Sequence, residues 1–164
     1  MSESSMGTIY VVDTSAFMDW QDRLYPEDVF PSLVVHIDAL ISSGRLMSVE
    51  LVRDEVNAMG SVGLQAWAKA RATIFAPKAT HLAGALTIEG AYPALKDPRS
   101  VHDEADAYVI AFAQMNGATV VTAETPAATK RKPRRAMYVP DVCAALGMPC
   151  ISNLGMMRRE GWRL

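Results

Sequence analysis

The sequence has few of the residues that crosslink small proteins or hold them in membranes. Only two of its 164 residues are cysteines, Cys143 and Cys150, and neither has a CxxC partner or a nearby histidine. This disfavours a disulfide or a zinc site and favours reduced thiols in the cytosol. No apolar run approaches the roughly 18 residues of a membrane span, and the N-terminus lacks an apolar signal core. We therefore expect a cytoplasmic protein that does not contact a membrane.

Nucleotide-binding signatures and overall positive charge are also missing. No GxGxxG or GxxxxGK[ST] pattern follows an apolar run, which disfavours dinucleotide and P-loop sites. A formal net charge of −2 excludes a broadly basic nucleic-acid coat protein. Five basic residues nevertheless fall within six positions: Lys130, Arg131, Lys132, Arg134 and Arg135. This run predicts a local patch for a polyanion such as RNA, although it could also be a solvated loop.

The pattern of apolar residues predicts the fold class. Half of the residues are hydrophobic, enough for the core of one domain. We expect strands near 8–13, 45–49, 118–122, 137–139 and 150–151, and helices near 27–43, 64–75, 79–90, 100–116, 141–146 and 153–160, with a further helix around Glu55. Gly44 and Gly117 are the expected helix stops. Alternating strands and helices predict a three-layer α/β/α sandwich with a central parallel sheet. We expect residues 8–164 to form this single domain after a flexible tail, 1–7.

Asp13 is the most informative residue that the chain contains. It ends the apolar run Thr8-Ile9-Tyr10-Val11-Val12 and is followed by two hydroxyl residues, Thr14 and Ser15. A carboxylate at the carboxyl end of a buried strand lies where open α/β sheets keep their active sites. The alternative is that Asp13 is an ordinary polar residue in a turn at the end of the strand.

Further acidic residues follow the other predicted elements. Glu55 comes after the second strand, Asp103 and Asp106 open the helix before the strand 118–122, and Glu124 follows that strand. A helix that precedes a parallel strand begins at the edge where that strand ends, so these acids should approach Asp13. Carboxylates packed together repel unless they are protonated or bridged by a cation, and hard oxygen ligands suit Mg²⁺ or Mn²⁺. Thr14, Ser15 and Thr122 are candidate donors that would orient these carboxylates. Each acid also has an ordinary explanation as a solvated helix or loop residue.

These residues resemble the PIN-domain nucleases. The likeness lies in Val11-Val12-Asp13-Thr14-Ser15-Ala16-Phe17, Asp54-Glu55-Val56, Asp106-Ala107-Tyr108-Val109-Ile110-Ala111-Phe112-Ala113 and Val120-Val121-Thr122-Ala123-Glu124. The ending Val139-Pro140-Asp141-Val142-Cys143-Ala144-Ala145-Leu146-Gly147 is similar to one bacterial PIN subfamily that was long catalogued as a domain of unknown function. The order and spacing of the pieces, more than any single one, carry the resemblance.

The resemblance implies an α/β/α sandwich, one or two Mg²⁺ or Mn²⁺ ions and hydrolysis of RNA phosphodiester bonds. Its four acidic positions map onto Asp13, Glu55, Asp106 and Glu124, with Asp103 as an auxiliary metal ligand. Metal ligation is expected from Asp13, Asp106, Glu124 and Asp103. Two positions depart from the family, which usually has Asn at the position of Ser15 and Asp at that of Glu124.

The resemblance also implies a biological role. Many small bacterial PIN domains are toxins of VapC type, silenced by an antitoxin protein that occupies the acidic groove. We expect such a toxin, with an antitoxin as partner and with the choice between monomer and homodimer left open. An aspartyl phosphatase is disfavoured, since it needs an acid at the position of Ser15. The main alternative is a PIN-like module that binds RNA or protein without cleaving it.

Overall fold

A five-stranded parallel sheet lies at the centre of the protein. The computed structural model describes residues 6–101 and 103–164. The strands follow the order β3-β2-β1-β4-β5, and all pair in parallel. Their bounds are Tyr10–Val12 for β1, Leu46–Val49 for β2, Phe75–Ala76 for β3, Thr119–Val121 for β4 and Cys150–Ile151 for β5. Residues 1–5 of the predicted tail lie outside the described residues, while Met6 and Gly7 are exposed coil.

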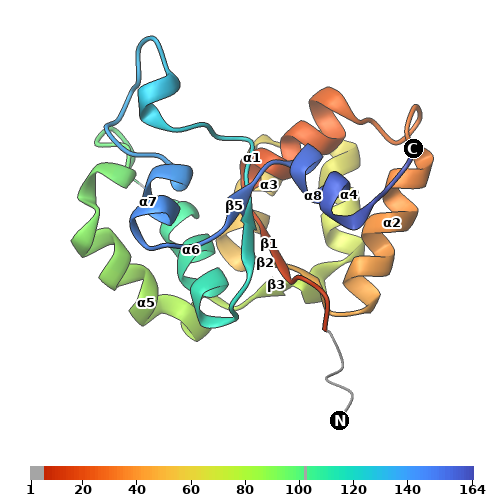
Figure 1. Ribbon diagram of the computed structural model, residues 1–164, viewed down its shortest axis with the longest axis horizontal. Coiled ribbons are helices and arrows are strands. Elements are labelled where there is room, and N and C mark those ends of the chain that lie inside the picture. The colour runs from red at the N-terminus through yellow and green to blue at the C-terminus, as the bar shows by residue number, and fades with distance from the viewer. Residues whose placement is uncertain (1–5, 102) are drawn as a thin grey trace.

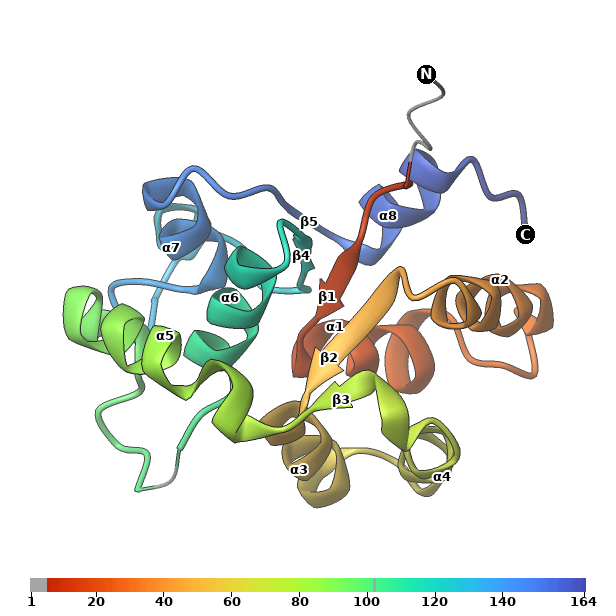
Figure 2. The same ribbon diagram turned by 90° about the horizontal axis from the view of Figure 1, so that it is seen from below.

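Helices cover both faces of this sheet, as predicted. The α-helices are α1 (Thr14–Met18), α2 (Pro31–Ser42), α3 (Glu50–Met59), α4 (Val62–Ala70), α5 (Lys78–Ala91), α6 (Asp106–Met115), α7 (Val139–Ala145) and α8 (Asn153–Glu160). Shorter helical turns are η1 (Asp19–Leu24), η2 (Ala72–Ile74), η3 (Pro93–Leu95) and η4 (Ala127–Thr129). Helices α5, α6 and α7 lie on one face, and α2, α4 and α8 on the other (Figures 1 and 2). The predicted three-layer α/β/α class is therefore confirmed.

Burial explains why this arrangement is stable. Strands β1 and β4 are buried along their whole length, and so is every residue of α6 from Ala107 to Ala113. Such continuous apolar runs are expected of elements that are covered on all sides. Gly44 and Gly117, the predicted helix stops, have positive φ angles of 70° and 59°, which a residue with a side chain rarely adopts. No helix in the described part of the chain has the length and apolar content that crossing a bilayer requires.

An aromatic cluster anchors α1 to α4. Phe17 packs against Trp67 of α4 with ring centroids 5.4 Å apart, and Trp20 meets Trp67 edge-on at 4.8 Å. Helix α8 adds polar support, because Asn153 Nδ2 donates to the carbonyl oxygen of Ala16 at 2.8 Å. The segment that follows Asp13 is thus anchored to α4 and to α8.

Some predicted elements have different bounds in the structure. Helix α1 begins directly after Asp13, whose side chain caps it, whereas no helix was predicted there. Helix α6 begins at Asp106 and not near Ser100. The strand expected near 137–139 is absent from the described sheet, because Val139 already belongs to α7. Phe75, predicted as the last residue of a helix, instead begins the edge strand β3, which it forms with Ala76.

Candidate functional site

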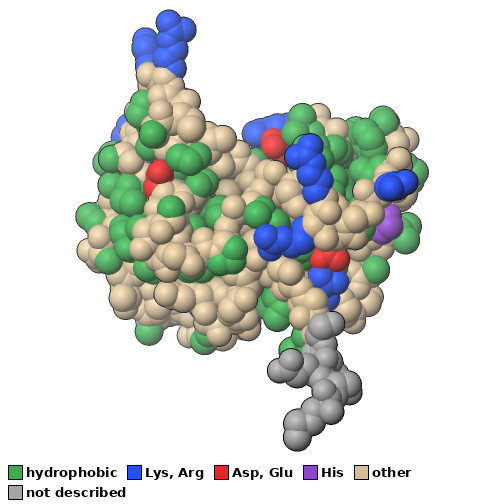
Figure 3. Space-filling view, in the orientation of Figure 1, with side chains coloured by type: hydrophobic (Ala, Val, Ile, Leu, Met, Phe, Trp, Pro, Cys, Tyr) green, Lys and Arg blue, Asp and Glu red, His purple; other side chains and the backbone are tan. Residues whose placement is uncertain are grey.

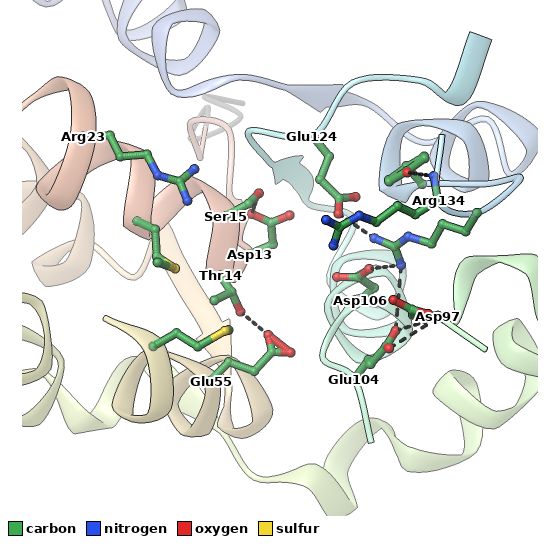
Figure 4. Close-up of a pocket in the computed structure, with 14 residues that line it drawn as sticks. Asp13, Thr14, Ser15, Arg23, Glu55, Asp97, Glu104, Asp106, Glu124 and Arg134 are labelled. Carbon is green, nitrogen blue, oxygen red and sulfur yellow. Dashed lines mark hydrogen bonds and ion pairs between the residues drawn. The ribbon is translucent and has the colours of Figure 1, made fainter. Parts of the chain in front are cut away.

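An open cavity lies at the carboxyl ends of β1 and β4. Its volume is about 600 Å³, and six carboxylates and three guanidinium groups line it. The lining residues are Asp13, Thr14, Ser15, Met18, Arg23, Glu55, Met59, Asp97, Glu104, Asp106, Glu124, Arg134, Arg135 and Tyr138. Figure 4 shows Asp13 and Glu55 on one side of the cavity and Asp106, Glu104 and Asp97 on the opposite side. The four acids mapped from the sequence therefore share one cavity but stand on two walls.

Asp13 is buried at the floor of this cavity. Its backbone N–H donates to the carbonyl of Val121 at 3.0 Å, which fixes its place beside β4. Its carboxylate accepts hydrogen bonds from Ala16 N and Ser15 Oγ, both at 2.8 Å, and from the Thr122 hydroxyl. Burial nevertheless raises the pKa of Asp13 to about 7, since the side chain is only 2% exposed. A nearby cation would favour the charged form.

Two hydroxyl residues join the β1–α1 turn to the end of β4. Ser15 Oγ lies 3.2 Å from Thr122 Oγ1 and accepts from Ala123 N at 3.0 Å. Thr122 Oγ1 in turn accepts from Glu124 N at 3.0 Å. These contacts orient Asp13 and the backbone that leads to Glu124. Both residues stand where hydroxyl donors for the carboxylates were predicted.

Glu55 reaches the same wall from α3. Its Oε2 accepts from Thr14 Oγ1 at 2.7 Å, and its Oε1 accepts from Ala105 N at 3.0 Å. Burial raises the pKa of Glu55 in spite of these hydrogen bonds, and the charges of Glu104 and Glu124 raise it further. The hydrogen bond to Ala105 also connects α3 with the start of α6.

The opposite wall is an acidic cluster around one arginine. Asp106 Oδ2 accepts from Arg135 Nη1 at 2.9 Å, and Glu124 Oε1 accepts from Arg135 Nη2 at 2.7 Å. Glu104 Oε2 lies 3.8 Å from Arg135 Nη1. Burial, followed by the charge of Glu124, raises the pKa of Asp106 well above its usual value, while Arg135 opposes this rise. The sequence predicts Arg135 as an RNA-binding residue, whereas in the structure it pairs with these acids.

Asp103 and most of the predicted basic run lie away from the cavity. Asp103, expected as an auxiliary metal ligand, does not line it and pairs with Lys78 Nζ at 2.5 Å with its side chain 49% exposed. Of the basic run, Arg134 and Arg135 line the cavity, while Lys130 Nζ lies 4.3 Å from the Tyr138 ring. Arg131, Lys132 and Arg134 are exposed. Figure 3 shows Lys and Arg side chains gathered at the tip of the projection between β4 and α7.

Three further residues that the sequence motifs do not predict also line the cavity: Arg23, Asp97 and Tyr138. Arg23 belongs to the π-helical turn η1, and Asp97 lies in the connection before α6. Each reaches the cavity through the folding of a segment that has no motif of its own. Only the position of Tyr138 just before a Pro-containing helix start could have been a sequence signal.

The residues fit a hard divalent cation by donor type and charge. Six carboxylates and three guanidinium groups line the cavity, and burial raises the pKa values of Asp13, Glu55 and Asp106, so that a cation bound beside them would favour their charged forms. Among the described residues, however, no three His, Cys, Asp or Glu side chains are grouped closely enough to hold a metal ion. The division between two walls and the pairing with Arg135 explain this. Side chains would have to turn before they could coordinate an ion together.

Comparison with known proteins identifies a family. A search of curated proteins gives no match. Residues 10–164, which include every acid of the cavity, match the family described as Domain of unknown function (DUF4411). The chain belongs to this family.

Proposed function

We propose that the protein is a ribonuclease that hydrolyses phosphodiester bonds in RNA with Mg²⁺ or Mn²⁺. The observation that carries the proposal is that the buried Asp13 and the half-buried Asp106, both with raised pKa values, face each other across an open cavity at the carboxyl edge of a parallel sheet. The resemblance to PIN-domain nucleases and the exposed basic side chains beside the cavity support the same reaction.

The acids and arginines that line the cavity would have separate roles in the reaction. Asp13 and Asp106 would hold the divalent ion together with Glu124, and the ion would supply a water of lowered pKa and polarise the phosphate. Glu55, fixed by Thr14, is placed to accept a proton from the attacking water, and Glu124 is placed to orient that water or a second ion. Arg23 on one wall and Arg134 near the other would contact phosphates of the bound strand.

Cleavage of a labelled single-stranded RNA tests the proposal. We expect hydrolysis with Mg²⁺ or Mn²⁺ and none in excess chelator. Asp13→Asn and Asp106→Asn should each lower the rate by at least about a hundredfold, as loss of a transition-state contact does. Asp28→Asn is the matched control, because Asp28 is exposed and does not line the cavity. Chelator-resistant cleavage, or full activity of both cavity variants, would contradict the proposal.

The alternative, a module that binds RNA or protein without cleavage, is favoured by one observation. Arg135 already pairs with Asp106 and Glu124 and offsets one of their two negative charges, so this wall repels a polyanion less than unpaired carboxylates would. Tight binding of the same RNA in Mn²⁺, with no product after prolonged incubation, would decide for this alternative.

The proposed biological role is a toxin with an antitoxin protein as partner, and it rests on the resemblance. Induced expression in bacterial cells should then arrest growth, whereas Asp13→Asn should not. Growth arrest by both forms would separate toxicity from the cavity chemistry.

A further inference from the structure

The guanidinium of Arg135 occupies a cation site built by the chain itself. It donates to Asp106 Oδ2 and to Glu124 Oε1 at 2.9 and 2.7 Å, and its Nη1 also donates to the carbonyl of Leu95. The Tyr138 ring lies 4.6 Å from the guanidinium carbon, and the Arg135 side chain is only 13% exposed. Arg135 is therefore packed and paired on several sides, and it differs from an exposed residue of a solvated loop.

The same oxygens are those that a divalent ion would need. Asp106 Oδ2 and Glu124 Oε1 face Arg135, and Glu124 Oε2 accepts from Val139 N at 3.0 Å. The guanidinium takes up one lone-pair direction on Asp106 Oδ2 and one on Glu124 Oε1, so an ion bound by both acids would lie next to it. Two cations held side by side would also repel, most strongly in a site shielded from water. Binding of an ion by these two acids therefore competes with their pairing to Arg135.

Arg135 lies on a segment that can release it. Residues 130–137 contain no helix or strand, and Arg131, Lys132 and Arg134 are exposed. The connection between β4 and α7 projects beyond the carboxyl edge of the sheet (Figure 1). Arg135 ties this segment to the acids, while Met137 packs against the core at its far end, so a shift that releases Arg135 would be confined to residues 130–136.

We propose that Arg135 and a divalent cation exchange at Asp106 and Glu124. One guanidinium leaves as one cation binds, and Arg135 then becomes available to a phosphate group of the RNA at the cavity mouth. The exchange rests on the proposed function in that the cation is the one used for hydrolysis. Its central step, however, needs no RNA and can be measured without it.

Calorimetric titration of the whole chain with Mn²⁺ tests the exchange. Arg135→Gln should bind Mn²⁺ at least about tenfold more tightly than the parent, because the competing cation has been removed. Arg131→Gln, an exposed neighbour that does not line the cavity, should bind within about twofold of the parent. A merely structural role of Arg135 predicts the opposite result, since its loss would disorder the acids. Equal or weaker binding by Arg135→Gln would therefore overturn the proposal.

A second measurement uses the unaltered chain and so does not depend on the folding of a variant. Trypsin cleaves after exposed arginines, and Mn²⁺ should speed cleavage after Arg135 relative to cleavage after Arg131, as followed by mass spectrometry. Calcium-saturated trypsin acting on an unrelated substrate controls for effects of Mn²⁺ on the protease. No change, or slower cleavage after Arg135, would contradict release of this side chain.

The two proposals fail separately. Tighter Mn²⁺ binding by Arg135→Gln together with no RNA cleavage by the parent would uphold the exchange and reject the ribonuclease. Mn²⁺-dependent RNA cleavage by the parent together with unchanged Mn²⁺ affinity in Arg135→Gln would do the reverse.

Discussion

The carboxylate of Asp13 is buried, and burial disfavours its charged form. Three hydrogen bonds to its oxygens oppose that penalty, yet the pKa still rises from 3.8 to about 7. The folded state therefore holds a proton that the unfolded chain would release between these pH values. Linkage then makes this contribution to stability complete below about pH 3.8, and it is lost as the pH rises through about 7. At about 1.4 kcal/mol per pKa unit, the loss amounts to a few kcal/mol.

Asp13→Asn should remove this pH dependence. We expect the free energy of unfolding of the variant, minus that of the parent, to increase between pH 5 and pH 8 when both are measured by urea denaturation in chelator. Asp106 and Glu55 titrate in both proteins, and loss of the Asp13 charge also removes one cause of the raised pKa of Asp106, which changes the difference in the same direction. A difference that stays flat across this range would mean that Asp13 is charged in the metal-free protein at all these pH values.

Thr122 should stabilise the charged form of Asp13. Its hydroxyl donates to Asp13 and accepts from Glu124 N, and the hydrogen bond lowers the pKa of Asp13. Thr122→Val keeps the shape but leaves both partners unsatisfied, at a cost of about 1–3 kcal/mol. The loss should be larger at pH 8 than at pH 5, because the ionised carboxylate needs the donor more. Thr122→Ser is the control that retains the hydroxyl, and an equal loss in both variants would assign the effect to packing.

At the scale of elements, the segment between η4 and α7 divides its basic residues between two tasks. Arg135 turns inward to the acids, while Arg131, Lys132 and Arg134 remain exposed. Exposed cations beside an open cavity are suited to the phosphates of a single strand. Binding through such contacts releases counterions and therefore weakens as salt increases.

Replacing Arg131, Lys132 and Arg134 by Gln should weaken RNA binding and flatten its salt dependence. Each lost phosphate contact should remove roughly 0.7 from the magnitude of the log–log slope for a single strand. Fluorescence anisotropy across a salt series measures this slope. The matched control replaces Lys69, Arg158 and Arg163, which are also exposed but do not line the cavity. An unchanged slope in the first variant would return these residues to the role of a solvated loop.

Elements with a strong local signal could be predicted, and those fixed by distant contacts could not. Neighbouring residues specify the buried runs of β1 and β4, and they also specify the helix stops at Gly44 and Gly117. Strand β3 has only two residues and gains its identity from pairing with β2, so its sequence continues the preceding helical pattern. Arg135 and Asp106 are 29 positions apart, and Lys78 and Asp103 are 25 positions apart. Neither pair therefore produces a periodic pattern in the sequence.

At the scale of the whole molecule, the two ends of the chain are joined around the site. Helix α8 supports α1 through Asn153, and its last residue, Glu160, accepts from Tyr10 Oη at 2.7 Å and pairs with Arg45 beside β2. The carboxylates of one wall come from the first half of the chain, and those of the other wall from the second half. The site therefore exists only when the complete sheet and α8 are in place.

This organisation predicts that the chain unfolds as one unit. Trp20 and Trp67 report on the core, whereas Trp162 near the C-terminus stacks on His36 of α2 with ring centroids 4.9 Å apart. Tryptophan fluorescence and far-UV circular dichroism should give one midpoint in urea, as two-state unfolding requires. Asn153→Ala removes the side-chain donor to the Ala16 carbonyl, which keeps its backbone partner Asp19, and should lower both midpoints together, by about 1 kcal/mol of stability. The change in fluorescence between the parent and Trp162→Phe isolates the C-terminal signal. A separate transition of that signal at lower urea would mean that α8 unfolds alone and that the walls of the cavity form without it.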